Sequence, residues 1–321
     1  MKYIKLFTNN AEYEEYYASE HPTPNVSLAV AENDVHYEPI PPHDYSQDYL
    51  TFIAKADGTF KFSGNSVNYS LDSGETWISL ASNTNSPTVT SGNKIMWKAT
   101  LTPRSGSTSH GIGTFTSSAK FDVEGNPMSL LFGDNFKGKT SLSGKDYAFY
   151  DLFSRNTNVV SADNMSLLAT TLADNCYANM FSGCTSLTEA PQLPATTLAN
   201  GCYANMFSGC TSLTTAPSVL PATTLADSCY SYMFYGCTSL TTAPQLPATT
   251  LAKQCYFLMF GGCTSLNHIE CLATDISADT CTIGWVSDVA SSGTFVKAAS
   301  MTSWTEGVSG IPSNWTVQDA S

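Results

Sequence analysis

Ten cysteines are the residues best able to do chemistry in this 321-residue chain, and eight of them recur in pairs. The two members of a pair are eight residues apart, and the pairs are Cys176/Cys184, Cys202/Cys210, Cys229/Cys237 and Cys255/Cys263. Thiolates can bind zinc, but the sequence has no C-x-x-C pair, and a spacing of eight leaves two sulfurs about 80° apart around an ideal helix. We therefore predict buried free thiols that fill the interior and no metal site. Disulfides are the second interpretation.

The repeats that carry these cysteines predict how they are positioned. Successive Cys-Tyr pairs are 26, 27 and 26 residues apart, and each unit continues with Met-Phe, Gly-Cys and Thr-Ser-Leu. Inward-facing Leu187 and Leu193 predict a short strand that proline ends. Leu198, Cys202 and Met206, four residues apart, predict a short helix. Because one unit cannot bury its own apolar stripe, the units must stack into a solenoid with a short strand plus a short helix per coil.

The repeat motif also resembles a known family. MFSGCTSLT followed by APQLPATTLA is similar to the BspA-type leucine-rich repeats of gut bacteria and of the phages that infect them, and the resemblance covers residues 145–283. The following segment, with Trp285, Trp304 and Trp315, resembles the end of such arrays. These tryptophans could cover the apolar stripe that the last coil leaves exposed.

The first half of the chain predicts β structure. Short runs of alternating apolar and polar residues lie between turn signals such as Asp57-Gly58. We interpret Trp77 and Trp97 as core residues, with a carbohydrate-stacking platform as the alternative. The predicted fold class is multidomain, with four parts: an extended attachment arm (1–48), a small all-β sandwich or barrel (49–140), the leucine-rich-repeat solenoid (141–284) and a C-terminal cap (285–321).

The N-terminal segment predicts attachment. It is rich in proline and has little periodic hydrophobicity, which is typical of an extended, poorly packed segment. Its PNVS and VHYEP motifs resemble the opening of structural proteins from gut phages, including crAss-like phages that infect Bacteroidetes. The resemblance implies docking to other virion proteins, with strand edges available for β-augmentation. The implied attachment residues are Pro24, Asn25, Val26, Val35, His36 and Tyr37.

The sequence predicts no enzyme, no catalytic residue and no cofactor. It contains no G-x-S-x-G, H-E-x-x-H, Walker or G-x-G-x-x-G motif. Of the five histidines, three lie in the proline-rich segment, His110 lies in a Gly/Ser-rich stretch and His268 takes an outward repeat position. We expect each to be exposed to solvent. The acidic turn at Asp72 is too short to predict a calcium site.

The charge distribution and the length of the apolar runs each exclude one class of partner. The net charge is −13, and residues 151–321 carry three Lys/Arg against 11 Asp/Glu. Without a basic patch, nucleic-acid binding through phosphate neutralisation is excluded. No apolar run is long enough for membrane insertion or for a signal peptide, so we expect folding in the cytoplasm.

Together these features predict a non-enzymatic phage virion structural protein, a head or tail fibre or similar appendage, that presents its repeats to a host surface glycan or protein. The predicted ligand-binding residues are the outward positions of the repeat strands: Thr188, Glu189, Gln192, Thr214, Thr215, Ser218, Thr241, Thr242, Gln245, Asn267 and His268. A merely solvated face is the alternative for these positions. A homotrimer is expected by analogy with fibres. The alternative functions are a BspA-type adhesin at the bacterial cell surface and a cytosolic protein-binding scaffold.

Overall fold

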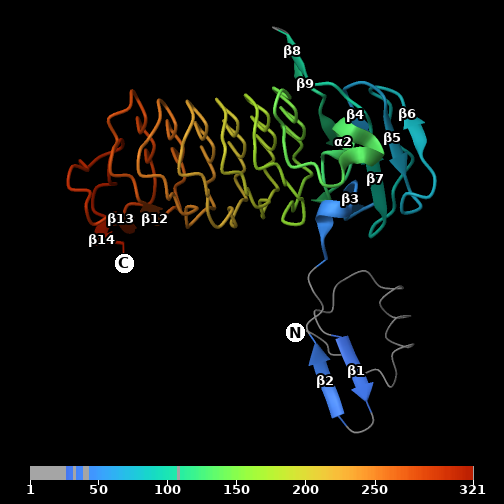
Figure 1. Ribbon diagram of the computed structural model, residues 1–321, viewed down its shortest axis with the longest axis horizontal. Helices are drawn as coiled ribbons and strands as arrows, with labels where there is room; N and C mark the ends of the chain where they lie inside the picture. The colour runs from blue at the N-terminus through green and yellow to red at the C-terminus, as the bar shows by residue number, and fades with distance from the viewer. Residues whose placement is uncertain (1–26, 32–33, 39–42, 107–108, 321) are drawn as a thin grey trace. The chain divides into compact units, whose positions relative to one another are not determined.

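A computed structural model describes residues 27–31, 34–38, 43–106 and 109–320 (Figure 1). The chain divides into two compact units, Met1–Asp44 and Tyr45–Ser321. In the first unit, β1 (Ser27–Ala31) and β2 (Asp34–Glu38) pair as an antiparallel hairpin. The predicted extended arm therefore contains a hairpin among its described residues.

The second unit begins with antiparallel β structure. Its elements are η1 (Tyr45–Gln47), β3 (Leu50–Ala54), β4 (Phe60–Phe62), β5 (Val67–Ser70), β6 (Ile78–Leu80), β7 (Lys94–Lys98), β8 (Arg104–Gly106), β9 (Ser109–Gly111), β10 (Phe115–Ser117), β11 (Phe121–Glu124), α2 (Ser129–Phe132) and η2 (Gly133–Phe136). Five strands form one sheet in the order β11-β3-β7-β5-β6, while β4 pairs with β10 and β8 pairs with β9. Alternation of buried and less buried residues along β7 matches a sheet with one face on the core.

Aromatic rings fill the core of this β region. Phe52 on β3 lies within 4.8–5.6 Å of the rings of Phe60, Trp97 and Phe121, measured between ring centroids. Trp97 is fully buried, which confirms its interpretation as a core residue. Such tilted ring pairs contribute to stability beyond the area they bury.

The repeats are built from turns. Asn175, Asn179 and Gly183 have φ values of 53°, 57° and 73°, and the same four-residue spacing of left-handed residues recurs in each later unit. The N–H groups of this segment alternate between two kinds of acceptor. That of Met180 donates to the carbonyl of Tyr177 three residues back, and that of Asn179 donates to a carbonyl of the next unit. Successive units therefore bond to one another through every second residue.

We call each unit a coil and number five of them: 145–172, 173–198, 199–225, 226–251 and 252–277. Figure 1 shows the coils as a row of loops that follows the β region. The first coil continues directly from the β region, because the N–H of Val123 on β11 donates to the carbonyl of Ser161 at 2.8 Å.

The predicted fold class is wrong. It required a short helix and a short strand in each coil. Among the described residues, α2 is the one α-helix and it lies outside the repeats, and single parallel bridges link the coils where the repeat strands were expected. The sheets are small, and none of them runs through the repeats to build the predicted solenoid. A helix would have consumed every N–H internally, whereas here alternate N–H groups bond to the neighbouring coil. The spacing of four was misread because the side chains at that spacing do share one face.

Two columns of stacked rings run through the coils. The first contains Phe149, Tyr177, Tyr203, Tyr230 and Tyr256, and the second contains Phe153, Phe181, Phe207, Phe234 and Phe260. Neighbouring rings within the columns are 5.2–6.2 Å apart. Each inner ring of a column is therefore covered by its equivalents on both sides, which is how repeats share a continuous core.

The C-terminal residues close these columns. Trp285 stacks on Tyr256 at 6.0 Å and on Trp304 at 5.6 Å, and its indole N–H donates to the carbonyl of Gly310. A parallel three-stranded sheet begins in the fifth coil and continues into the C-terminal residues. Its strands are β12 (His268–Cys271), β13 (Thr294–Lys297) and β14 (Thr316–Asp319). These contacts confirm that Trp285 covers the last coil, with Trp304 stacked on its outer side, whereas the indole N–H of Trp315 donates to the carbonyl of Ala290. Within the described residues, no helix has the length and apolarity to cross a membrane.

Candidate functional site

The predicted ligand-binding residues lie along one edge of successive coils, which we call the polar ladder. Parallel bridges align Glu189 with Thr215 and Thr242 with His268. Nine of these eleven side chains, Glu189 among them, are exposed, whereas Thr188 and His268 are half-buried. The expectation of full exposure is therefore wrong for His268, which belongs to β12.

Part of the polar ladder is already bonded internally. The hydroxyl of Thr214 donates to the carbonyl of Thr188 at 3.2 Å, and the hydroxyl of Ser218 donates to the Gln192 side chain at 3.2 Å. The Gln245 amide donates to Glu270 at 2.8 Å. These bonds join one coil to the next, so they stiffen the face. In the described part of the chain, the side-chain hydroxyls of Thr215, Thr241 and Thr242 make no such bond and are available to a ligand.

The cysteines fill the interior. All ten are buried with free thiols. The thiol of Cys210 donates to the carbonyl of Phe181 in the preceding coil at 3.1 Å, and Cys184, Cys237 and Cys263 repeat this bond. Burial raises the pKa of Cys202 to about 12. The thiolate that nucleophilic attack or metal binding requires is therefore scarce at neutral pH. Among the described residues, no group of three His, Cys, Asp or Glu is placed to hold a metal ion.

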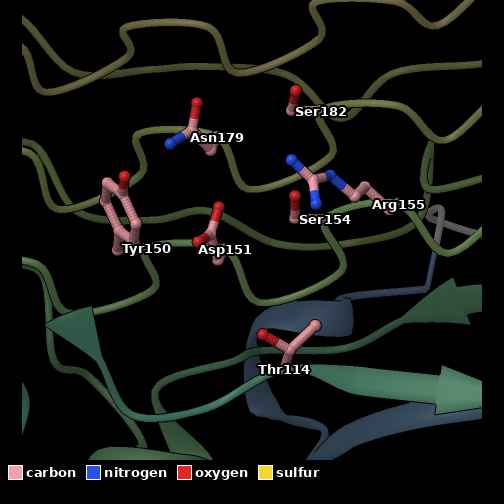
Figure 2. Close-up of a pocket in the computed structure, with 7 residues that line it drawn as sticks. All are labelled: Thr114, Tyr150, Asp151, Ser154, Arg155, Asn179 and Ser182. Atoms are coloured by element: carbon pink, nitrogen blue, oxygen red, sulfur yellow. The ribbon is translucent and has the colours of Figure 1, made fainter. Parts of the chain in front are cut away.

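A polar cleft of about 360 Å³ lies where the β region meets the first two coils (Figure 2). Thr114 precedes β10, and the other lining residues come from the turns of the first and second coils: Tyr150, Asp151, Ser154, Arg155, Asn179 and Ser182. The volume is within the range of small-molecule sites. Figure 2 shows the Arg155 side chain extended between Ser154 and Ser182, toward Asp151, with Tyr150 and Asn179 on the far side.

Asp151 is the acidic group of the cleft. Burial raises the pKa of its carboxyl group above the ordinary value of 3.8. Hydrogen bonds from Ser154 and Asn179, and the positive charges of Arg155 and His110, oppose this shift. The carboxyl group can therefore accept hydrogen bonds from a ligand, and it takes up a proton more readily than an exposed aspartate.

Arg155 is the basic group of the cleft, and its side chain is exposed. Among the described residues, no carboxylate lies within ion-pair distance of its guanidinium group. The other two basic residues of the C-terminal half do have partners: Lys253 with Asp279 at 3.6 Å, and Lys297 with Asp319 at 2.5 Å.

Aromatic rings flank the cleft on the side of the β8–β9 hairpin. The His110 ring lies 4.5 Å from the Tyr147 ring and 5.3 Å from the Tyr150 ring. A side chain at Gly111 would collide with the Tyr150 carbonyl oxygen, because its Cβ would lie 2.6 Å from that atom, so glycine permits the hairpin to approach. His110 is half-buried, which corrects the expectation that it is exposed.

Sequence reasoning missed this cleft. The first unit has Ala148 and Asn156 in place of the two cysteines, which marked it as degenerate. The signal that would have located the cleft is Arg155, which occupies the position held by glycine in the next four coils.

Two other groups of predicted residues have separate outcomes. Val35, His36 and Tyr37 belong to β2 of the hairpin, whereas Pro24, Asn25 and Val26 lie outside the described residues. Trp77 is half-buried, and the Lys98 ammonium lies 4.2 Å from its ring centroid. This cation–π contact occupies a ring face that a stacked sugar would need.

Comparison with known proteins identifies no relative: no family model, no curated protein and no solved structure matches the chain.

Proposed function

We propose that the chain is a non-enzymatic adhesion protein of a phage virion, attached through its N-terminal segment and binding a host surface through the polar ladder. The observation that carries the proposal is the repetition of exposed polar side chains along the ladder, on coils whose rings are spaced by 5.2–6.2 Å. A surface of this kind makes many weak contacts that add up on a multivalent particle.

The rigidity of the ladder supports this role. Hydrogen bonds such as Ser218 to Gln192 link the coils, and the backbone N–H of Ala190 donates to the carbonyl of Thr215 at 2.9 Å. Side chains already held in place lose little conformational entropy when a ligand binds. We therefore expect the hydroxyls of Thr215, Thr241 and Thr242 to form the hydrogen bonds with the ligand.

The adhesion part is tested by host-cell binding of the purified full chain. The variant Thr215→Lys, Thr241→Lys, Thr242→Lys places three bulky cations on the ladder. A matched control, Thr197→Lys, Thr224→Lys, Thr250→Lys, places the same charges on a separate threonine column, in the second to fourth coils. We expect the ladder variant to bind at least about tenfold more weakly than both wild type and control. Equal binding by the two variants would contradict the ladder as the adhesive surface.

The virion part is tested by mass spectrometry of purified particles. Peptides of the chain should be present at a constant ratio to the capsid protein. Recovery in the host envelope fraction, with no peptide in particles, would contradict virion attachment and favour a bacterial surface adhesin.

A further inference from the structure

Several non-glycine residues of the repeats have left-handed backbone conformations, and Arg155 is the one that takes a position held by glycine in the following coils. The third left-handed position of each turn segment is glycine in the second to fifth coils, at Gly183, Gly209, Gly236 and Gly262, with φ of 72–74°. In the first coil this position is Arg155, with φ of 60°. A residue with a side chain is strained in this region, and such strain is concentrated at functional sites.

The side chain at this strained position faces the polar cleft. Its aliphatic stem crosses Gly183, because a Cβ at that glycine would lie 3.4 Å from the Arg155 Cγ. The guanidinium end extends toward Asp151 between two serine hydroxyls (Figure 2). Because its fork has no carboxylate partner among the described residues, it can receive an anionic group in two-point geometry.

Apart from Arg155 and Asp151, the cleft is lined by uncharged hydrogen-bonding groups. Hydroxyls come from Thr114, Ser154 and Ser182, and an amide comes from Asn179. The Tyr150 ring borders the space. One cation combined with several hydroxyl and amide groups, without an apolar pocket for a side chain, matches a ligand with one carboxylate and many hydroxyls.

We propose that this cleft binds a carboxylate-bearing sugar residue, a uronic acid or a similar acidic monosaccharide, with Arg155 pairing to the carboxylate and the neutral groups binding the ring hydroxyls. The cleft shares no residue with the polar ladder, so this proposal goes beyond the adhesion function and is tested without a host or a particle. Asp151 accepts a hydroxyl hydrogen bond from the sugar. Its place in the cleft is compatible with an anion because it takes up a proton more readily than an exposed aspartate.

The test is titration of the full chain with methyl glucuronide, in which binding is measured by calorimetry and by saturation-transfer NMR. Two further probes separate the parts of the ligand: methyl glucoside has the hydroxyls without the carboxylate, and N-acetylglycine has a carboxylate without the sugar. We expect a dissociation constant on the order of 1 mM for the glucuronide, and at least about tenfold weaker binding of the other two.

Three variants assign the carboxylate contact. Arg155→Gln should weaken glucuronide binding by about tenfold, and Arg155→Lys should weaken it less, because lysine keeps the charge but loses the fork. Lys253→Gln is the matched control, since it removes one positive charge from the repeats outside the cleft, and its affinity should stay within about twofold of wild type. Arg155→Gly should lose binding while the protein remains at least as stable, because glycine relieves the strain. This variant separates loss of binding from loss of folding.

Four results would overturn the proposal. They are the absence of saturable glucuronide binding by wild type, equal affinity for the glucoside, equal affinity for N-acetylglycine, and unchanged glucuronide affinity in Arg155→Gln. The third would identify a general carboxylate site in place of a sugar site. An equal loss in Lys253→Gln would contradict the assignment of the contact to Arg155.

Discussion

The middle coils and the first coil share one backbone but differ in the residues at their left-handed positions. The second coil uses Asn175, Asn179 and Gly183, whereas the first uses Tyr147, Asp151 and Arg155 at similar φ values. Asparagine and glycine tolerate this region best, so the second coil is the one whose sequence agrees with its backbone.

The middle coils repeat the residues that pack the interior, whereas the first coil carries the polar residues that line the cleft. The middle coils repeat rings, thiols and glycines that stack on their own copies. The first coil keeps the ring columns through Phe149 and Phe153 but places large polar side chains at the outer turn, where they line the cleft. The residues that line the cleft are therefore departures from the repeat pattern. Exchanging residues between the two kinds of coil tests this division.

The largest effect is expected from removing a ring in a middle coil. Phe207 is fully buried and stacks on Phe181 and Phe234 at 5.7 and 5.5 Å. Phe207→Ala leaves a cavity in the column and should lower the free energy of unfolding by about 3–5 kcal/mol, as measured by urea denaturation followed by circular dichroism. Exposed Thr211 in the same coil provides the control, since Thr211→Ala should change the free energy of unfolding by less than about 0.5 kcal/mol. A loss below about 1 kcal/mol for Phe207→Ala would mean that the column does not carry the stability.

The second effect comes from exchanging residues at the third left-handed position. Gly209 has φ of 74°, and an added Cβ would meet only ordinary contacts at 3.7 Å. The cost of Gly209→Ala is therefore conformational, and we expect the free energy of unfolding to fall by about 1–2 kcal/mol. Arg155→Gly makes the reverse change in the first coil and should raise the free energy of unfolding by up to about 1 kcal/mol. Stability changes of the same sign in both variants would contradict the assignment of strain to Arg155.

The sequence predicted the interior better than the backbone. Period, burial of the cysteines and closure by tryptophan all follow from which residues are apolar and how often they recur. The prediction of a helix in each coil was wrong, because apolar residues four apart fit both a helix and a chain of turns. Asn175, Asn179 and Gly183 carry the deciding information, since residues that favour positive φ recur every four positions.

The cleft could not be predicted, for a different physical reason. Its lining residues come from three segments: Thr114 before β10, the first coil and Asn179 with Ser182 in the second. Their proximity depends on the coils stacking directly against the β region, which no local pattern specifies. The polar ladder could be predicted because it repeats within one motif. The hydrogen bonds of Thr214 and Gln245 to neighbouring coils could not be predicted from the motif.

A third exchange compares the two residues used in the first ring column. The first coil has Phe149 where the middle coils have tyrosine, and the hydroxyls of Tyr177 and Tyr203 are buried with no hydrogen-bond partner among the described residues. A buried unpaired hydroxyl is destabilising. Tyr203→Phe should therefore raise the free energy of unfolding by about 0.5–1 kcal/mol in urea denaturation. A decrease of more than about 1 kcal/mol would show that this hydroxyl makes a stabilising bond.

The smallest effect concerns Asp151, which occupies the position of Asn179 in the next coil. Burial raises the pKa of Asp151 in the folded protein above the unfolded value of 3.8, so the folded state holds this proton more tightly. The resulting stabilisation is fully present below pH 3.8 and is lost as the pH rises through the folded pKa. Asparagine has no such proton, so the stability of Asp151→Asn relative to wild type should increase between about pH 3 and pH 7.

The control for this pH dependence has the opposite sign. Hydrogen bonds from Ser277 lower the pKa of Asp275, so its stabilisation is present above the unfolded pKa and is lost as the pH falls. The stability of Asp275→Asn relative to wild type should therefore decrease over the same range. Arg155, His110 and Tyr150 face Asp151, and His110 contributes to its electrostatics, so the series is repeated in a His110→Gln background. If Asp151→Asn shows the same slope as Asp275→Asn, the first coil holds its aspartate charged, and the cleft would repel the carboxylate that Arg155 is proposed to bind.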